Sequence, residues 1–107
     1  MAITNAQLAS TTTTKIFLSS GQNAITSMFF CNVTTGTSAT FDLYIVPYTT
    51  SSNASIQTQV LKAVSLPPAE TFVFDTERLI LEDNDSIYAQ ASAGNVVTST
   101  ISYIATA

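Results

Sequence analysis

Five carboxylates crowd into the stretch FVFDTERLILEDNDSIYAQAS, residues 72–92, although the whole chain has only seven. They are Asp75, Glu77, Glu82, Asp83 and Asp85. Acidic side chains gathered in this way could hold a divalent cation or supply the paired acids of a glycosidase. A calcium loop of the EF-hand type needs a central glycine and a closing glutamate, and residues 82–86 have neither. A glycosidase needs two acids facing one cleft with separated pKa values, and nothing in this spacing requires that arrangement.

The simpler interpretation of the acidic stretch is that it marks β-turns. Asp, Asn and Ser between apolar runs hydrogen-bond to nearby backbone amides and tolerate left-handed backbone geometry. Residues 82–86 lie between two apolar runs, and Asp75 and Glu77 follow a third. We therefore predict turns and surface charge here, with Arg78 as a surface ion-pair partner. Cation binding by residues 82–85 is the alternative.

No other residues form a catalytic pattern. The absence of histidine removes His-based triads, most zinc sites and the commonest general base. Three scattered glycines cannot form a phosphate-binding loop. Cys31 lies in an apolar run and is predicted to be a small buried side chain and not a nucleophile. The sequence therefore predicts a protein that is not an enzyme and has no catalytic, cofactor-binding or metal-binding residues.

Two further patterns bear on binding. Asn32-Val33-Thr34 and Asn53-Ala54-Ser55 match the glycosylation sequon, but such matches arise by chance in a chain this rich in Ser and Thr, and no export signal accompanies them. The chain has four tyrosines, at Tyr44, Tyr48, Tyr88 and Tyr103. They could line a sugar-binding face, as in a carbohydrate-binding module. Tyrosines at alternating strand positions are more often core or interface residues, so this function is the more remote alternative.

Charge limits the possible partners. Lys15, Lys62 and Arg78 are the only basic residues and the net charge is −4, so direct contact with nucleic acid is not expected. No run approaches about 18 apolar residues, so no membrane span is predicted. Charged residues make up 9% of the chain, against about 25% in ordinary globular domains. Apolar residues make up 46%, so Ser and Thr take the place of charge in a chain that folds.

β-Branched and aromatic residues dominate, and Gly, Pro, Asn and Ser interrupt them at intervals of roughly ten residues. This pattern predicts strands at residues 15–19, 24–33, 40–47, 71–74, 78–81, 86–92 and 96–106. Residues 56–66 suit a strand or a short helix, and the β-rich composition favours a strand. We predict a single all-β domain at residues 15–107, an antiparallel β-sandwich of about eight strands of the jelly-roll or Ig-like type. Residues 1–14 are polar and aperiodic, so they form an extended N-terminal arm, either disordered or laid across a neighbouring molecule.

Several predicted strands carry bulky side chains on both faces. They are Met28-Phe29-Phe30-Cys31, Leu43-Tyr44-Ile45-Val46, Leu79-Ile80-Leu81 and Val96-Val97. A sandwich of this size has one interior, so the second face of these strands would be left bare. Burying one large side chain is worth roughly 1.5–3 kcal/mol, and charged residues are scarce at interface cores. The sequence therefore predicts a homo-oligomer or a larger assembly.

Several segments resemble small virion structural proteins of tailed bacteriophages, over roughly residues 17–104. They are Phe29-Phe30-Cys31-Asn32, residues 39–47 (ATFDLYIVP), residues 68–75 (PAETFVFD), residues 79–89 (LILEDNDSIYA) and Ser102-Tyr103-Ile104. The resemblance implies a compact β-sandwich that is repeated in the virion and is assembled in the cytoplasm of the host bacterium. It carries no catalytic signature, so no active-site residue is transferred.

The resemblance implies two places in the particle. A capsid decoration (cement) protein would stabilise the head, as a trimer near threefold positions in contact with the major capsid protein. A neck, tail or fibre accessory would follow the symmetry of the tail, and its loop at residues 49–55 could recognise a host. The negative charge of the chain favours the outside of a shell, because a lining beside DNA would be repelled by phosphate.

Overall fold

The computed structural model describes residues 2–8, 12–48, 59–74, 79–94 and 96–105. Within these ranges the chain forms nine strands. They are β1 (Ala2–Gln7), β2 (Thr14–Leu18), β3 (Asn23–Asn32), β4 (Ala39–Val46), β5 (Gln59–Leu66), β6 (Thr71–Phe74), β7 (Leu79–Leu81), β8 (Ser86–Ala91) and β9 (Val97–Ala105). The described ranges contain no helix, and hence none with the length and hydrophobicity to cross a membrane.

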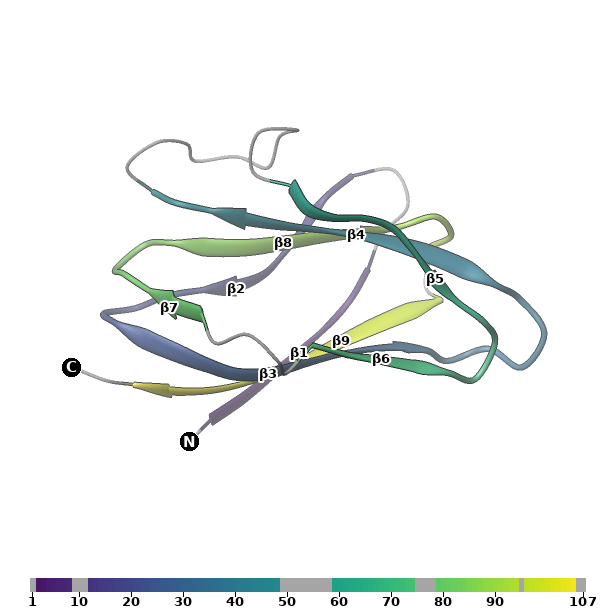
Figure 1. Cartoon of the computed structure of the whole chain (residues 1–107), viewed down its shortest axis with the longest axis horizontal. Coiled ribbons are helices and arrows are strands. Elements are labelled where there is room, and N and C mark those ends of the chain that lie inside the picture. The colour runs from purple at the N-terminus through teal and green to yellow at the C-terminus, as the bar shows by residue number, and fades with distance from the viewer. Residues whose placement is uncertain (1, 9–11, 49–58, 75–78, 95, 106–107) are drawn as a thin grey trace.

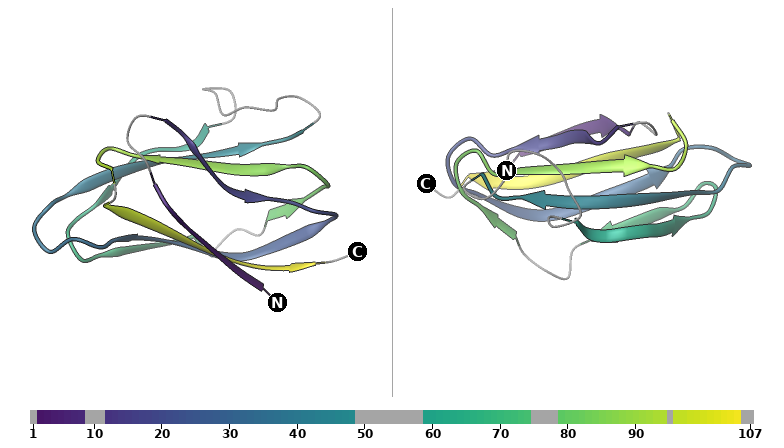
Figure 2. Two further views of the ribbon diagram at one scale, coloured as in Figure 1. Left: turned by 180° about the vertical axis from the view of Figure 1, so that it is seen from behind. Right: turned by 90° about the horizontal axis from the view of Figure 1, so that it is seen from above.

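The strands form two antiparallel sheets that lie one over the other (Figure 1), and Figure 2 shows the same two layers from behind and from above. Sheet A has the order β1-β9-β3-β6, and sheet B has the order β2-β8-β4-β5. Strand β6 pairs with residues 28–31 of β3 and β7 pairs with residues 23–25, so these two short strands follow one another along one edge of sheet A. The prediction of an all-β fold with two antiparallel sheets is confirmed.

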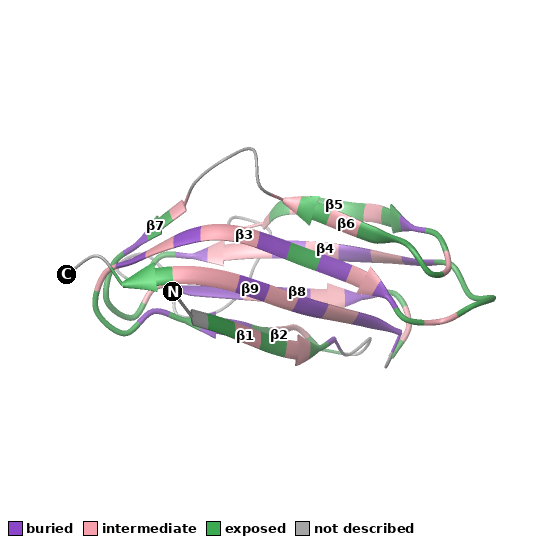
Figure 3. Cartoon of the chain, turned by 90° about the horizontal axis from the view of Figure 1, so that it is seen from below, coloured by how far each residue is buried: buried purple, intermediate pink, exposed green. Residues whose placement is uncertain are grey.

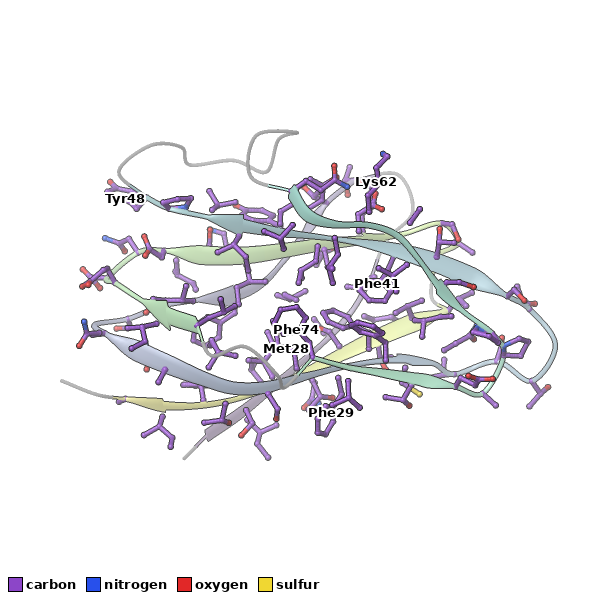
Figure 4. The ribbon with its side chains drawn as sticks, in the orientation of Figure 1. Met28, Phe29, Phe41, Tyr48, Lys62 and Phe74 are labelled. Carbon is purple, nitrogen blue, oxygen red and sulfur yellow. The ribbon has the colours of Figure 1, made fainter. Side chains whose placement is uncertain are left out.

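The core lies between the sheets and is held together by aromatic side chains. Phe30 of β3 stacks on Phe41 of β4 with ring centroids 4.4 Å apart, and Phe72 of β6 meets Phe41 edge-on at 5.6 Å. Strand β4 alternates between buried and half-buried residues, so that Phe41 and Leu43 face inward. Figure 4 shows the Phe41 ring between the two sheets. Phe30 and Phe72 come from sheet A and Phe41 comes from sheet B, so the three rings join the two sheets.

The ambiguous stretch at residues 56–66 resolves in favour of a strand where it is described. Residues 59–66 form β5 at the edge of sheet B, next to β4, and residues 56–58 lie outside the described residues. The predicted strand at residues 40–47 corresponds to β4, and the predicted strand at residues 96–106 corresponds to β9. Strand β4 begins and ends one residue before its prediction, because side-chain patterns do not record where backbone pairing stops. Residue 106, the predicted end of the last strand, lies outside the described residues.

The N-terminal segment differs from its prediction as an arm. Residues 2–7 form β1, which pairs with β9 of the same chain, from Ala2 opposite Tyr103 to Gln7 opposite Thr98. Leu8 is 1% exposed, belongs to the core and donates its amide to the carbonyl of Val97 at 2.9 Å. The sequence did not predict this strand, because the inward positions of β1 hold small or polar residues and give no apolar alternation. Pairing with β9 uses the backbone, so it needs no apolar pattern.

A buried asparagine ties three segments together at one end of the sandwich. The side chain of Asn32, at the end of β3, is fully buried. Its amide nitrogen donates to the carbonyls of Thr37 and Leu66 at 2.7 and 2.9 Å. Its oxygen accepts from the backbone amide and the hydroxyl of Thr34 at 3.0 and 2.7 Å. Leu66 ends β5 in sheet B, so this one side chain links the two sheets through all of its hydrogen-bonding groups.

Candidate assembly interface

The outer face of sheet A exposes large apolar side chains, beginning with a cross-strand pair. Phe29 lies between the buried residues Met28 and Phe30 and points away from the core (Figure 4). Val73 of β6 pairs directly opposite Phe29, and the two side chains are 47% and 42% exposed, respectively. Thr100 of β9 pairs with Phe29 on its other side. Side chains paired in this way are neighbours on one face of a sheet, so Phe29 and Val73 form one apolar patch.

A second apolar row crosses the same face near the C-terminal end of β9. Ala24 of β3 pairs with Ile104 on one side and with Ile80 of β7 on the other. Ile80 is 63% exposed, and Ile104 is exposed as well. Ile3 of β1 is 66% exposed and pairs with Ser102 of β9. Three isoleucines from three different strands are therefore exposed to solvent on this side of the molecule.

The rest of this outer face is polar but carries no charge. Its remaining outward positions in β1, β3, β6 and β9 are Asn5, Gln7, Ser27, Cys31, Thr71, Thr98 and Thr100. Figure 3 views this side of the molecule and colours its strands by burial. Among the described residues no Lys, Arg, Asp or Glu lies on the outside of sheet A. We call this surface the uncharged face. The depletion of charge together with exposed large apolar groups is typical of the core of a protein interface.

The outer face of sheet B has a different character. It carries Lys15 of β2, Asp42 of β4 and Lys62 of β5, with Tyr44 and Tyr88 paired opposite each other between them. The ammonium of Lys15 lies 5.7 Å from the centre of the Tyr88 ring. Partial burial, together with the nearby Asp42 carboxylate, raises the pKa of Tyr44 above the ordinary tyrosine value. The two outer faces therefore divide the surface into an uncharged side and a charged, aromatic side.

The four segments predicted to carry bulky side chains on both faces of a strand differ in how far those side chains are exposed. Phe29 and Ile80 are exposed, as expected for bulky groups on the second face of their strands. The other two clusters were wrongly expected to leave bare groups. In residues 43–46 the side chains of Leu43 and Val46 are buried and their neighbours are half-buried. Residues 96 and 97 are both buried, because residue 96 precedes β9 and packs into the core from the turn.

The acidic turn at residues 82–85 forms hydrogen bonds with segments that are distant in the sequence. The Asp85 carboxylate accepts the backbone amides of Tyr48 and Glu82, each at 2.9 Å. The Asp83 carboxylate accepts the backbone amide of Gly21 at 2.8 Å, which ties this turn to the β2–β3 turn. Within the described ranges no group of three or more His, Cys, Asp and Glu side chains could hold a metal ion. The predicted turn is confirmed for residues 82–85, whereas Asp75, Glu77 and Arg78 lie outside the described residues.

Replacing Asp85 by Ala is expected to lower the free energy of unfolding by about 1–3 kcal/mol, because two backbone amides lose a charged acceptor. The measurement is chemical denaturation followed by circular dichroism. Glu82→Ala is the control, since among the described residues its side chain makes an exposed contact with Gln22 at 3.2 Å, and the substitution should cost less than about 0.5 kcal/mol. A rise in the melting temperature with added Ca²⁺ that disappears in Asp85→Ala would instead make the turn a cation site.

The remaining predicted residues fall in different places. Cys31 is half-buried on the uncharged face and not in the core, because Phe30 and Asn32 on either side of it point inward. The Asn32 sequon is unsuited to glycosylation in the folded chain, because the asparagine amide is buried and donates two hydrogen bonds. The second sequon and the loop at residues 49–55 lie outside the described residues.

The tyrosines do not form one surface. Tyr103 packs edge-on against Phe17 at 4.7 Å, and Tyr48 is exposed just beyond the end of β4. Only Tyr44 and Tyr88 of the four share a face. Ile3 was missed as a surface residue because its segment is polar and was assigned to an arm.

No protein-family model matches this chain, and comparison with curated proteins and with solved structures finds no similar protein.

Proposed function

We propose that this chain is a non-enzymatic structural protein of a bacteriophage particle, a decoration protein that stabilises the head through contacts between subunits. The observation that carries the proposal is the uncharged face of sheet A. This face exposes four large apolar side chains to solvent, those of Phe29, Val73, Ile80 and Ile104. Among the described residues, none on this face carries a charge. Covering this face with a neighbouring subunit would remove the apolar groups from water without burying an unpaired charge.

The order of the strands supports the jelly-roll alternative over the Ig-like one. The chain crosses between the sheets repeatedly, so that β1 lies beside β9 in sheet A while β2 lies beside β8 in sheet B. If β6 and β7 count as one interrupted strand along β3, the sandwich has two four-stranded sheets. A double sheet of eight strands is the jelly-roll arrangement, which recurs in viral capsid domains, whereas Ig-like sandwiches divide their strands differently.

The distribution of charge supports a position on the outside of a shell. Glu82 and Asp83 are exposed in the β7–β8 turn at one end of the sandwich, and the net charge of the chain is −4. A surface of this sign repels phosphate, so it suits the exterior of a head better than a lining beside DNA. In this role we expect a trimer at threefold positions, with the uncharged face against other copies or against the major capsid protein.

Electron microscopy of virions labelled with an antibody to this protein tests the proposed place. A decoration protein predicts labelling distributed over the whole head. Labelling restricted to the neck, the tail or the fibres would replace decoration by an accessory role in the tail. Particles that contain the chain nowhere would overturn the assignment to the virion.

A further inference from the structure

A polar hollow of about 260 Å³ opens on the outer face of sheet B. It lies between β4, β5 and β8 and is lined by Thr40, Asp42, Lys62, Ala63, Gln90, Ala91 and Ser92. Lys62 projects from β5 away from the core (Figure 4). The hollow is on the opposite sheet from the uncharged face, so a subunit bound to sheet A would leave it open. Concave sites with a few convergent polar groups are where proteins bind small ligands.

The hollow is built around an irregular part of β5. Ala63 has a φ of +51°, a left-handed conformation that is uncommon for a residue with a Cβ and unusual inside a strand. The register of β5 against β4 shifts at the same place, between Phe41 and Leu43 and between Leu43 and Tyr44. The Asp42 carboxylate holds this bulge by accepting the Ala63 amide at 2.7 Å. Bulges of this kind redirect side chains and are common beside binding sites.

The chemistry of the lining favours a neutral ligand with many hydroxyl groups. Asp42 offers a carboxylate, Lys62 an ammonium, Gln90 an amide, and Thr40 and Ser92 hydroxyls, so the lining contains both hydrogen-bond donors and acceptors. An anionic ligand would meet the Asp42 carboxylate, and a cationic ligand would meet the Lys62 ammonium. The charges of Asp42 and Lys62 balance. A neutral ligand that donates and accepts hydrogen bonds is repelled by neither of these two side chains.

An aromatic surface borders the hollow on the same face. Tyr44 follows Asp42 by two residues in β4, and Tyr88 precedes Gln90 by two residues in β8, so the two tyrosines form the next row along the sheet. The influence of Asp42 on the pKa of Tyr44 agrees with this closeness. A sugar ring has a rim of hydroxyl groups and flat C–H surfaces, so it matches a polar hollow beside aromatic side chains.

We propose that the outer face of sheet B binds a neutral saccharide, with one sugar ring in the hollow hydrogen-bonded to Asp42 and Gln90 and a neighbouring ring against Tyr44 and Tyr88. This assignment does not rest on the proposed decoration role, because the two use opposite sheets. In a virion subunit whose sheet A is covered, the saccharide site would face outward.

The test applies the full chain to an array of neutral, sialylated and sulfated glycans, then titrates the best neutral oligosaccharide by calorimetry. Asp42→Asn keeps an oxygen that can accept the Ala63 amide but removes the charge, and it is expected to weaken binding at least about tenfold. Asp83→Asn is the matched control, since Asp83 accepts the Gly21 amide as Asp42 accepts that of Ala63, and it should leave the affinity unchanged. Gln90→Leu is expected to weaken binding as well. Gln90 lies in β8, so this substitution leaves the bulge in β5 unchanged.

Three outcomes would overturn the proposal. One is that no neutral glycan binds at millimolar concentration. Another is that Asp42→Asn, folded as judged by its melting temperature, binds as tightly as Asp83→Asn and the native chain. The third is binding confined to sialylated or sulfated glycans and lost in Lys62→Gln, which would make the hollow a site for anions.

Discussion

Replacing Asn32 by Asp is expected to lower the free energy of unfolding by about 3–5 kcal/mol. The substitution preserves the shape of the side chain but turns its two donors into a carboxylate oxygen. That oxygen would face the carbonyls of Thr37 and Leu66, which the native amide reaches at 2.7 and 2.9 Å. Both carbonyls would lose their donor, and a charge would be buried without a partner. Most small domains have a total stability of about 5–15 kcal/mol, so much of it would be lost.

The matched control for Asn32→Asp is Asn5→Asp. Asn5 also lies in a strand, but it is exposed on the uncharged face, where its amide donates to the hydroxyl of Thr100 at 2.9 Å. The same substitution there should cost less than about 1 kcal/mol, because water can solvate the new carboxylate. Denaturant titrations of both variants at one protein concentration give the comparison. Equal losses of stability at the two positions would show that Asn32 does not link the sheets as described.

Replacing Phe41 by Ala is the second large effect, with an expected loss of about 3–5 kcal/mol in the free energy of unfolding. Phe41 is buried between the sheets, where it stacks on Phe30 and meets Phe72. Removing the ring leaves a cavity where rings of β3, β4 and β6 meet, and the backbones of the two sheets cannot collapse to fill it. The variant is therefore expected to lose a large part of the native stability and to unfold at a lower temperature.

Phe29→Ala is the control for Phe41→Ala, since Phe29 is 42% exposed on the opposite side of sheet A. In the isolated subunit it should cost about 1 kcal/mol or less, because a half-exposed ring gives up little burial when it is removed. Thermal unfolding of both variants at low protein concentration provides the measurement, which keeps any effect of assembly small. A Phe29 variant as unstable as the Phe41 variant would mean that the uncharged face is part of a core.

The parts of the fold that follow from side-chain periodicity were predictable. Phe41 and Leu43 alternate with Asp42 and Tyr44, and this alone places β4 with one face in the core. The acidic turn was predictable because Asp and Asn have a local preference for turns. The exposure of Phe29 followed from the limited interior of a small sandwich, since a strand with bulky groups on both faces can bury only one of them.

The features that sequence could not predict depend on contacts between distant segments. The alternation in β3 does not say which side faces the core, and a register shift between Ile25 and Ser27 breaks it, so Cys31 was wrongly placed inside. Asn32 looks like any polar residue at the end of a strand until Leu66, 34 residues away, is seen to contact it. The bulge at Ala63 was also hidden, because a left-handed residue is expected to be Gly or Asn.

We propose that the uncharged face of sheet A is covered by another subunit, and the mass of the native chain in solution tests this proposal most directly. Size exclusion with light scattering at micromolar concentration should give an oligomer, with a trimer expected. Val73→Lys places a charge on that face, directly opposite Phe29, and should give a monomer with an unchanged fold. Val60→Lys adds the same charge at an exposed position of β5 in sheet B and should keep the native mass. A monomeric native chain, or a Val73→Lys variant with the native mass, would contradict the account.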